Sequence, residues 1–298
     1  MGANLKEVRE RIKSVVNTQQ ITKAMKMVSA AKLRRAQQAI TQIRPYSDRL
    51  NGMLRDILVN TDSDGTTAFG EVRDVENALL VIVTSNRGLC GAFNTNVLKA
   101  ATQHIEDHYQ EVRAQGKLHI MCIGKKGYDY ARKKFKDCNI INHHVNLFED
   151  LSFDNVARVS SLVMDAFLKG TYDKIDVAYG RFKNAGVQFP EVEEFLPVPK
   201  PSVHPDSVHN SKANYMFEPD EKSLLETLVP NILQVQFQRF MLDTHASEHG
   251  ARMTAMDKAT ENAGELLNDL KLSYNKARQD AITKELSEIV GGAAALGG

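Results

Sequence analysis

One stretch decides the fold of this chain: ANLKEVRERIKSVVNTQQITKAMKMVSAAKLRRAQQAITQIR, residues 3–44. It contains neither Gly nor Pro, and its first apolar residues alternate in spacing between three and four, as in a coiled-coil seam. These residues are Leu5, Val8, Ile12 and Val15. Continued at the same spacing, the seam would fall on polar residues. We therefore expect the line of apolar residues to shift round the helix, because a helix with 3.6 residues per turn drifts against a 3.5-residue repeat. The stripe is expected on Ile21, Met25 and Val28, and then on Leu33, Ala36, Ile40 and Ile43.

A second helical period runs from Glu221 to Val290, near the other end of the chain. At 1.5 Å per residue, the first segment would form a helix about 60 Å long and the second a helix about 100 Å long. Pro45 is expected to kink or end the first helix. A small sheet domain could not cover so long a helix. We therefore expect the two segments to bury their apolar stripes against each other as an antiparallel coiled coil.

The middle of the chain predicts a central Rossmann-like α/β domain. Short apolar runs alternate with helical stretches, which implies a small parallel or mixed sheet with helices on its faces. The expected strands are 78–85, 117–124, 139–147 and 174–182, with a helix at 153–170 and a final edge strand at 186–197 that contains Pro190. The predicted segments are 1–60 (N-terminal coiled-coil helix), 77–197 (α/β domain), 198–219 (proline-rich linker) and 220–291 (C-terminal coiled-coil helix).

Composition excludes several classes of protein. The 298 residues carry a net charge of +1, and no apolar run reaches the roughly 18 residues that a membrane-spanning helix needs. Three cysteines, Cys90, Cys122 and Cys138, form neither a disulfide framework nor a zinc pattern, which suits a reducing compartment. The chain start has no apolar core of a secretory signal.

Charge is concentrated at the N-terminal end. Residues 3–44 contain ten basic and two acidic side chains, a net charge of +8. Such a run is often only a solvated helix face. Alternatively it lies beside an acidic protein or a nucleic acid. The basic residues wind all round the helix and share it with a seam, which disfavours a DNA-reading helix.

Two glycine-containing stretches invite a phosphate-binding interpretation, TSNRGLCGAFN (84–94) and GKKG (124–127). Neither completes a dinucleotide fingerprint or a Walker loop. A tight strand-to-helix turn explains both better than a nucleotide site does. Cys90 would need a neighbouring base to act as a nucleophile, and a small buried residue at the turn is the simpler interpretation.

The stretch HASEH (245–249) has the form of an inverted zinc-protease motif. His245 and His249 are four residues apart and so share one helix face. Zinc needs a third ligand, and the following helix offers only glutamates. Two solvated histidines on a polar face are the expectation, with a metal site as the alternative.

Four stretches together resemble one family, the γ subunits of F-type (rotary, proton-translocating) ATP synthases. They are NTQQITKAMKMVSAAKLRRAQ (17–37), TSNRGLCGAFN (84–94), ARMTAMDKATENA (251–263) and YNKARQDAITKELSEIVGGAAA (274–295). The resemblance implies a non-catalytic central-stalk rotor that couples rotation of a membrane c ring to the catalytic sites of an α/β ring. It implies partners in the α and β subunits, the ε subunit and the c-ring subunits, with no nucleic acid and no membrane span. It also implies that this chain binds no cofactor, since ATP, ADP and Mg belong to the α and β subunits.

The same resemblance implies roles for particular residues. Met25 would face an acidic segment of β, and three C-terminal residues would hydrogen-bond a β loop: Arg278, Gln279 and Thr283. A structural turn would be formed by Arg87, Gly88, Leu89, Cys90, Gly91 and Asn94. Without the resemblance, the C-terminal trio would be interpreted as a plain exposed polar face.

Two positions depart from the family pattern. Asn86 stands where Asp is frequent and Asp257 where Lys is usual, so charge contacts near residue 257 are the least predictable. The cysteine-containing insertion and transit peptide of chloroplast members are absent, which indicates a bacterial protein on the cytoplasmic face of the inner membrane. Two rival hypotheses remain open, a Rossmann-type enzyme and a basic coiled-coil nucleic-acid binder.

Overall fold

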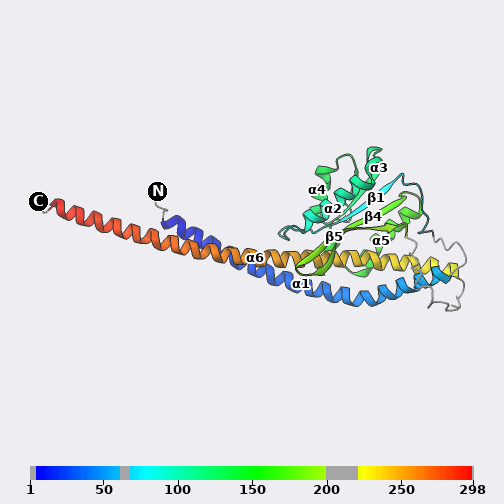
Figure 1. Ribbon diagram of the computed structural model, residues 1–298, viewed down its shortest axis with the longest axis horizontal. Coiled ribbons are helices and arrows are strands. Elements are labelled where there is room, and N and C mark those ends of the chain that lie inside the picture. The colour runs from blue at the N-terminus through cyan, green and yellow to red at the C-terminus, as the bar shows by residue number, and fades with distance from the viewer. Residues whose placement is uncertain (1–4, 61–67, 199–220, 297–298) are drawn as a thin grey trace. The chain divides into compact units, whose positions relative to one another are not determined.

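The computed structural model describes residues 5–60, 68–198 and 221–296. Contacts divide the chain into two units, residues 1–29 with 253–298 and residues 30–252. The division falls inside both long helices, α1 (Leu5–Asn60) and α6 (Glu221–Leu296) (Figure 1). The predicted linker 198–219 lies outside the described residues except for Val198, and the predicted segment boundaries remain a prediction.

Both long helices contain a proline. Pro45 lies inside α1 and Pro230 inside α6. Of the two expected effects of Pro45, a kink or an end of the helix, the end does not occur, because α1 continues to Asn60. Proline removes one backbone donor, a cost of about 3 kcal/mol. Burial of side chains just beyond it, at Ser47 and Leu50, supplies the tertiary packing that holds most protein helices together.

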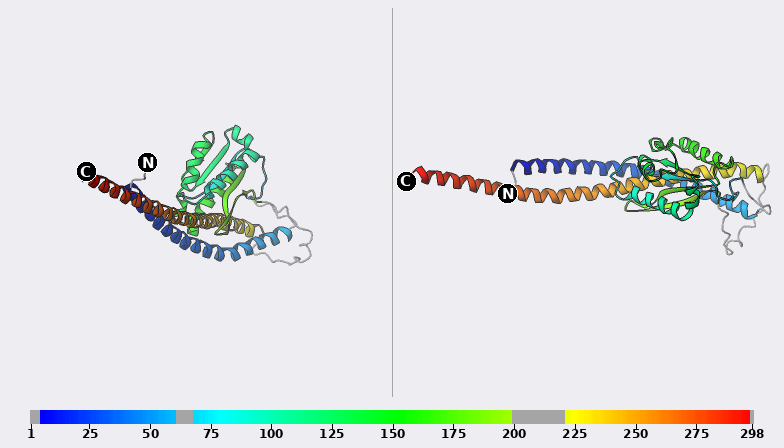
Figure 2. Two further views of the ribbon diagram at one scale, coloured as in Figure 1. Left: turned by 60° about the vertical axis from the view of Figure 1, so that its left-hand side comes forward. Right: turned by 90° about the horizontal axis from the view of Figure 1, so that it is seen from above.

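In the first unit, α1 and α6 run antiparallel. Arg9 Nη2 donates to Tyr274 Oη at 2.8 Å, whereas Gln19 Nε2 donates to the carbonyl oxygen of Thr260 at 3.4 Å. Lys26 forms an ion pair with Asp257. Residue numbers therefore rise along one helix as they fall along the other, which confirms the predicted antiparallel pair (Figure 2). Asp257, which departs from the family pattern, therefore supplies the carboxylate that neutralises Lys26 across the helix pair.

The seam of α1 follows the predicted stripe at Val8, Leu33, Ala36 and Ile40, which are buried, but not between residues 21 and 29. Thr22 and Ser29 are buried, while Ile21 and Val28 are 60% and 58% exposed. Among the described side chains of α1, the buried residues are separated by three, four, seven or fourteen positions, all of which fit a heptad seam: Val8, Thr22, Ser29, Leu33, Ala36, Ile40, Ser47 and Leu50. The Thr22 hydroxyl lies 2.8 Å from the Thr260 hydroxyl, so this polar group is buried with a partner. Apolar side chains on the neighbouring face are left uncovered by this chain.

The second unit contains a five-stranded sheet in the order β3-β2-β1-β4-β5. The strands are β1 (Ala78–Val83), β2 (Leu118–Ile123), β3 (Asn139–Ile141), β4 (Lys174–Asn184) and β5 (Val187–Leu196). All pairings are parallel except β4 with β5. The predicted edge strand with Pro190 is confirmed as β5. The predicted strand 139–147 stops at Ile141, because a turn follows and then a 3₁₀ helix, η1 (Leu147–Glu149).

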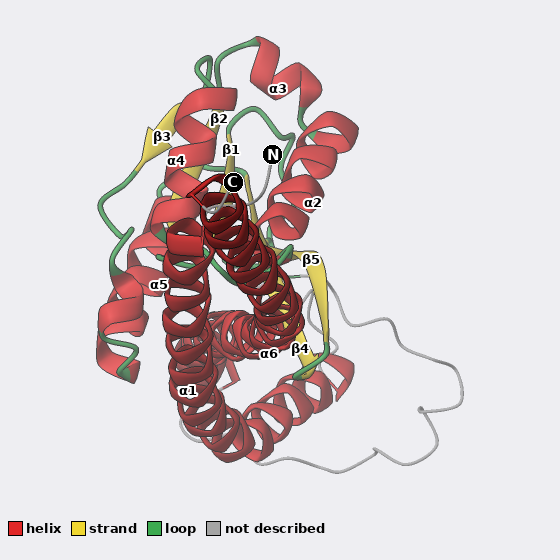
Figure 3. Ribbon diagram, turned by 90° about the vertical axis from the view of Figure 1, so that its left-hand side faces the viewer, coloured by secondary structure: helices red, strands yellow, loops and turns green. Residues whose placement is uncertain are grey.

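Helices cover both faces of this sheet (Figure 3). One layer consists of α2 (Phe93–His108), α3 (Gln110–Ala114) and α4 (Lys125–Lys134). The other consists of α5 (Phe153–Leu168) and the part of α6 that belongs to this unit. Strand β1 is fully buried and alternates between the two cores, with Leu79 on the α5 and α6 side and Leu80 on the α2 and α4 side. The predicted Rossmann-like domain is therefore present.

The packing of α6 on the sheet was not predicted. We expected its apolar stripe to face only the N-terminal helix, but Phe237 and Phe240 are fully buried in the sheet core. The Ser247 hydroxyl donates to the carbonyl oxygen of Gly180 on β4 at 2.9 Å. A Cβ atom at Gly180 would lie 2.4 Å from the ring of Phe93. Between Leu228 and Thr244, buried residues of α6 are too closely spaced for a single stripe and include the polar Gln238 and Asp243, so this part of the helix is covered on most sides.

Candidate functional site

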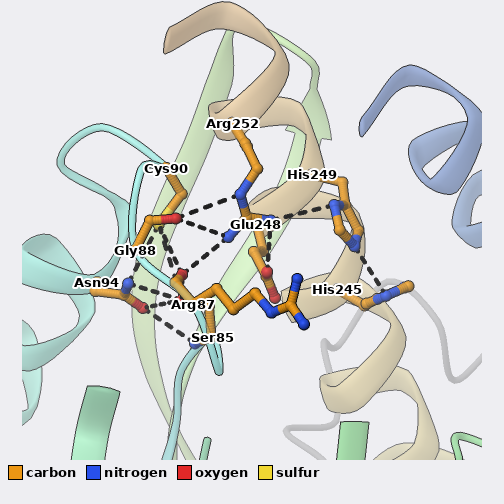
Figure 4. Close-up of polar contacts among 9 residues, drawn as sticks. All are labelled: Ser85, Arg87, Gly88, Cys90, Asn94, His245, Glu248, His249 and Arg252. Atoms are coloured by element: carbon orange, nitrogen blue, oxygen red, sulfur yellow. Dashed lines mark hydrogen bonds and ion pairs between the residues drawn. The ribbon is translucent and has the colours of Figure 1, made fainter. Parts of the chain in front are cut away.

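The turn between β1 and α2 is closed by its own side chains. Asn94 Oδ1 accepts from the Ser85 backbone N–H at 3.0 Å, and Asn94 Nδ2 donates to Cys90 Sγ at 3.2 Å. The Ser85 hydroxyl donates to the carbonyl oxygen of Arg87 at 2.7 Å. Leu89 has a φ of 61° and Gly91 a φ of 58°, so the chain reverses tightly before α2 (Figure 4). Cys90 is buried, as predicted from its place in the turn.

The start of α4 has no free donors for a phosphate. The backbone N–H groups of its first three residues bond Asn86 Oδ1 at 3.1 Å, the carbonyl oxygen of Ser85 at 3.1 Å and Thr84 Oγ1 at 2.7 Å. Anion sites at helix N-termini depend on such groups being available. The GKKG stretch therefore forms a helix-entry turn, locked to the end of β1. Asn86 contributes a side-chain oxygen here, which an aspartate could supply equally well.

Helix α6 is fastened to the β1–α2 turn by Arg252. Its Nη2 donates to the carbonyl oxygens of Arg87 at 2.9 Å and Gly88 at 3.1 Å, and its Nη1 lies 2.6 Å from Glu248 Oε1 (Figure 4). Both side chains of the ion pair are nearly buried. Burial raises the pKa of Glu248, whereas Arg252 lowers it. Charge-assisted hydrogen bonds of this kind are short and strong, so the turn and the helix form one rigid joint.

The two histidines of HASEH are not solvated, which makes that expectation wrong. His249 is 5% exposed, and its Nε2 lies 3.1 Å from Nε2 of His245. The ring of Phe148 stacks on that of His245 with centroids 6.0 Å apart. Burial, and then the positive charges of Lys32 and Arg252, lower the pKa of His245 to about 4. Burial, His245 and the same two cations lower the pKa of His249 to about 2.

The described part of the chain contains no group of three His, Cys, Asp or Glu side chains that could hold a metal ion. No helix among the described residues is long and apolar enough to cross a membrane.

Arg252 was not singled out from the sequence. The spacing of Glu248 and Arg252 does indicate a helical ion pair, but the carbonyl partners lie about 165 residues away along the chain, and local spacing carries no information on them.

The predicted partner-contact residues lie in the other unit. Met25 is half-buried on α1, and Arg278, Gln279 and Thr283 are exposed on α6. Among the residues that the structure describes, the side chains of this C-terminal trio make no hydrogen bond or ion pair. Since Arg9 meets Tyr274 and α1 begins at Leu5, α6 continues past the end of its partner helix (Figure 1). The continuation exposes a set of large apolar side chains: Ile282, Leu286, Ile289 and Val290.

A long helix pair with uncovered apolar and polar faces, carried by a chain that also forms a closed α/β domain, is typical of a structural subunit of a larger assembly. A family model described as ATP synthase matches residues 4–296. The ATP synthase gamma chain of Cytophaga hutchinsonii is 49% identical over 293 residues, which are 98% of this chain and 99% of the relative. That of Christiangramia forsetii is 48% identical, over 99% of this chain and 100% of the relative.

Solved structures share the fold. A chain of the Euglena gracilis mitochondrial ATP synthase (OSCP/F1/c-ring) superposes with a TM-score of 0.66 at 23% identity, over 98% of this chain and 94% of that chain. A chain of the Tetrahymena thermophila mitochondrial ATP synthase central stalk and c ring gives 0.57 at 21% identity, over 80% and 99%. This chain belongs to the ATP synthase gamma-chain family. The expected family, fold and non-catalytic role are thereby confirmed.

Proposed function

We propose that this chain couples rotation of a membrane ring of c subunits to conformational cycling of catalytic sites in a ring of α and β subunits. The observation that carries the proposal is the part of α6 beyond its pairing with α1. It is helical to Leu296, and its apolar side chains are exposed, with Leu286 57% and Ile289 66% accessible. Large exposed apolar surfaces mark interaction sites, and a helix that runs past its partner can enter a surrounding ring.

The coupling follows from differential contact. A shaft that is not symmetric presents a different face to each of several identical sites. Each orientation stabilises one conformation of a site over another by the difference in contact free energy, and that difference shifts the population. To move a two-state site from 1:99 to 99:1 takes about 5.5 kcal/mol of differential contact. A few well-packed side chains on the rotor can provide this amount.

The uncovered face of α1 supplies one candidate contact with β. Ile21, Met27 and Val28 are each more than half exposed, next to the half-buried Met25. The net charge of +8 over residues 3–44 suits an acidic partner segment. We infer that Met25 and its apolar neighbours pack on such a segment of β while the surrounding cations attract it.

The exposed trio on α6 supplies the second contact. Gln279 and Thr283 are one helical turn apart, and Arg278 adjoins Gln279. Their side-chain donors and acceptors have no partner among the described residues, so a β loop can bind them. We infer that Arg278, Gln279 and Thr283 hydrogen-bond such a loop as the rotor turns.

The remaining partners are proposed from the same role. The α/β domain would contact the ε subunit and the c ring, and the chain would lie on the cytoplasmic face of a bacterial inner membrane. It would bind no cofactor itself, because ATP, ADP and Mg would occupy the α and β subunits. The turn formed by residues 87–94 would be structural, holding α2 and α6 together through Arg252.

Reconstitution tests the function. The purified chain alone should neither hydrolyse ATP nor retain it in equilibrium dialysis. Added to purified α and β subunits, it should restore ATPase activity and co-elute with them in a defined ratio. ATP hydrolysis by the isolated chain would contradict the proposal, as would a chain that co-elutes with α and β without stimulating them.

A further inference from the structure

The outer face of α4 is densely cationic. Six basic side chains within twelve residues are exposed: Lys125, Lys126, Arg132, Lys133, Lys134 and Lys136. The acidic residues in this region are Asp129 and Asp137, and Asp137 is already bonded to Arg113. Three of the cations occupy the last turn of the helix, where positive charge complements the helix dipole. The dipole accounts for the position of these three, but not for all six.

Five other basic residues of the domain are neutralised by carboxylates. Arg113, Lys117, Lys174, Arg181 and Arg239 each form an ion pair with a carboxylate. Within the part of the chain that the structure describes, none of the six α4 cations has a carboxylate oxygen within ion-pair distance. Their charge is therefore unneutralised by this domain and is available to an external anion.

The face is held rigidly. Ala131 and Phe135 are fully buried beneath it, and the Gly127 N–H bonds Thr84 at 2.7 Å. Arg132 lies over the ring of Tyr128, 5.7 Å from its centroid, and Lys134 lies 5.8 Å from that of Tyr130. These cation–π contacts direct the side chains outward without removing their charge. The outer position of α4 in its layer is visible in Figure 1 and Figure 3.

We propose that this face of α4 binds anionic phospholipid headgroups at a membrane surface. Clusters of four to eight Lys and Arg residues on a helix are typical of attraction to anionic lipid. Five of the six cations are Lys, a point charge that needs no fixed geometry in its partner, whereas base-reading surfaces rely on Arg, Asn and Gln. A bilayer offers charge density without fixed positions, which matches cations spread over a broad arc of the helix.

A fluid partner also agrees with a turning domain. An acidic protein outside the rotor would have to release α4 at every step, whereas lipid headgroups exchange as the domain moves. The inference rests on the proposed function only for the presence of a bilayer nearby. Its test uses the isolated full-length chain, so the lipid-binding inference and the proposed function can fail separately.

Vesicle sedimentation tests the proposal. The chain should bind phosphatidylglycerol-containing vesicles at 0.1 M salt, lose binding at 1 M salt as screening shortens to about 3 Å, and ignore pure phosphatidylcholine vesicles. The variant R132Q/K133Q/K134Q/K136Q should bind at least about tenfold more weakly, since each cation near an anionic surface contributes roughly fivefold. A matched control, K99Q/R158Q/K169Q/K183Q, removes one Arg and three Lys exposed elsewhere on the domain and should bind like the parent.

Three results would overturn the inference. One is equal binding by the two quadruple variants, which would show that only net charge matters. Another is equal binding to phosphatidylcholine. The third is displacement of the chain from the vesicles by duplex DNA or by an acidic polyglutamate peptide. This displacement would have to occur when the concentration of phosphate or carboxylate groups on the competitor is below that of the anionic lipid. A chain that restores ATPase to α and β yet ignores anionic vesicles would remove this inference and leave the proposed function standing.

Discussion

The Nε2 atoms of His245 and His249 lie 3.1 Å apart inside the joint between α6 and the rest of its unit. At that distance one nitrogen donates and the other accepts, so the contact holds a single proton and both rings are neutral. A second proton in the contact would turn one ring into a cation and point two N–H donors at each other, with the positive groups of Lys32 on α1 and Arg252 on α6 facing the pair and Glu248 already paired with Arg252.

We therefore predict that acid destabilises the unit through this pair. The folded-state pKa of each histidine is lowered below its ordinary value of 6.5, to about 4 for His245 and about 2 for His249. The unfolded chain takes up protons first, so stability is complete above about pH 6.5 and falls as pH decreases through and below that value. At pH 5 the loss is about 2 kcal/mol for each histidine.

Urea unfolding of the parent chain at pH 7.5 and pH 5 measures this loss. The double variant H245Q/H249Q should lose much less stability between the two pH values, because glutamine keeps hydrogen-bonding groups and does not titrate. The variant H143Q alters an exposed histidine and should behave like the parent. An equal loss in the parent and H245Q/H249Q would show that other groups set the acid sensitivity.

The ion pair beside the histidines gives a prediction of opposite sign. Arg252→Met should destabilise the chain by about 3–5 kcal/mol, because it leaves the buried carboxylate of Glu248 uncompensated. Burial already raises the pKa of Glu248, and loss of Arg252 should raise it further. A folded-state pKa above the unfolded value adds stability below the unfolded pKa, and this stability disappears as pH rises, so the defect should grow from pH 5 to pH 7.5.

The variant R252M/E248Q is the control for this effect. It leaves no charged side chain at positions 248 and 252 and should unfold at a higher urea concentration than R252M at pH 7.5, although it still lacks the bonds to the carbonyl oxygens of Arg87 and Gly88. If the single and double variants unfold alike at both pH values, those two carbonyl bonds, rather than the charge, account for the contribution of Arg252.

The buried hydroxyl pair in the helix seam is a third point of test. Thr22 Oγ1 lies 2.8 Å from Thr260 Oγ1, and Thr260 also donates to the carbonyl oxygen of Met256 at 2.7 Å. Thr22→Val should cost about 1–2 kcal/mol by leaving a hydroxyl partly unsatisfied, whereas T22V/T260V should cost less than the sum of the single changes. Thermal unfolding followed by circular dichroism gives the coupling. Strict additivity would mean that the two hydroxyls do not interact.

These residues also show what the sequence could and could not predict. The apolar runs of β1, β2 and β4 are long and bounded by turn residues, and such patterns identify strands reliably. The seam of α1 was misplaced between residues 21 and 29 because Thr22 and Ser29 are polar, and Thr22 is buried against Thr260, which lies more than 200 residues away along the chain. Hydrophobic periodicity depends only on the hydropathy of each residue, so it cannot predict that a hydrogen bond between two helices will bury a polar side chain.

In the candidate site, too, the features with local sequence signals could be predicted and those that depend on tertiary packing could not. The closed turn at residues 84–94 could be predicted because its small residues, its Asn and its place after a strand are local signals. The buried state of His245 and His249 could not, because HASEH is polar taken alone and is covered by Phe148 and by neighbouring elements. The packing of Phe93, at the start of α2, on β4 depends on the absence of a side chain at Gly180, a tertiary condition.

The exposed trio on α6 provides the most direct test of the coupling contacts. The variant R278A/Q279A should fold and assemble like the parent, because both side chains are exposed and make no hydrogen bond or ion pair with another described residue, and Ala favours helix. It should synthesise ATP more slowly in membranes, since hydrogen bonds to a β loop would be lost at each step. A loss of about 1.5–3 kcal/mol per charged hydrogen bond would slow the coupled step at least about tenfold.

The matched control for that variant is N268A/K271A, which removes an amide and a cation from exposed positions of the same helix two turns earlier. Here α1 still lies alongside, since Tyr274 meets Arg9, so a surrounding ring is not expected to grip these side chains. Helix content, assembly and ATP synthesis should all match the parent. If both variants slow synthesis equally, the effect belongs to the charge or stiffness of α6 in general. If R278A/Q279A synthesises ATP at the parent rate after full assembly, the polar trio is only a solvated face, and the apolar stripe beyond it must make the coupling contacts.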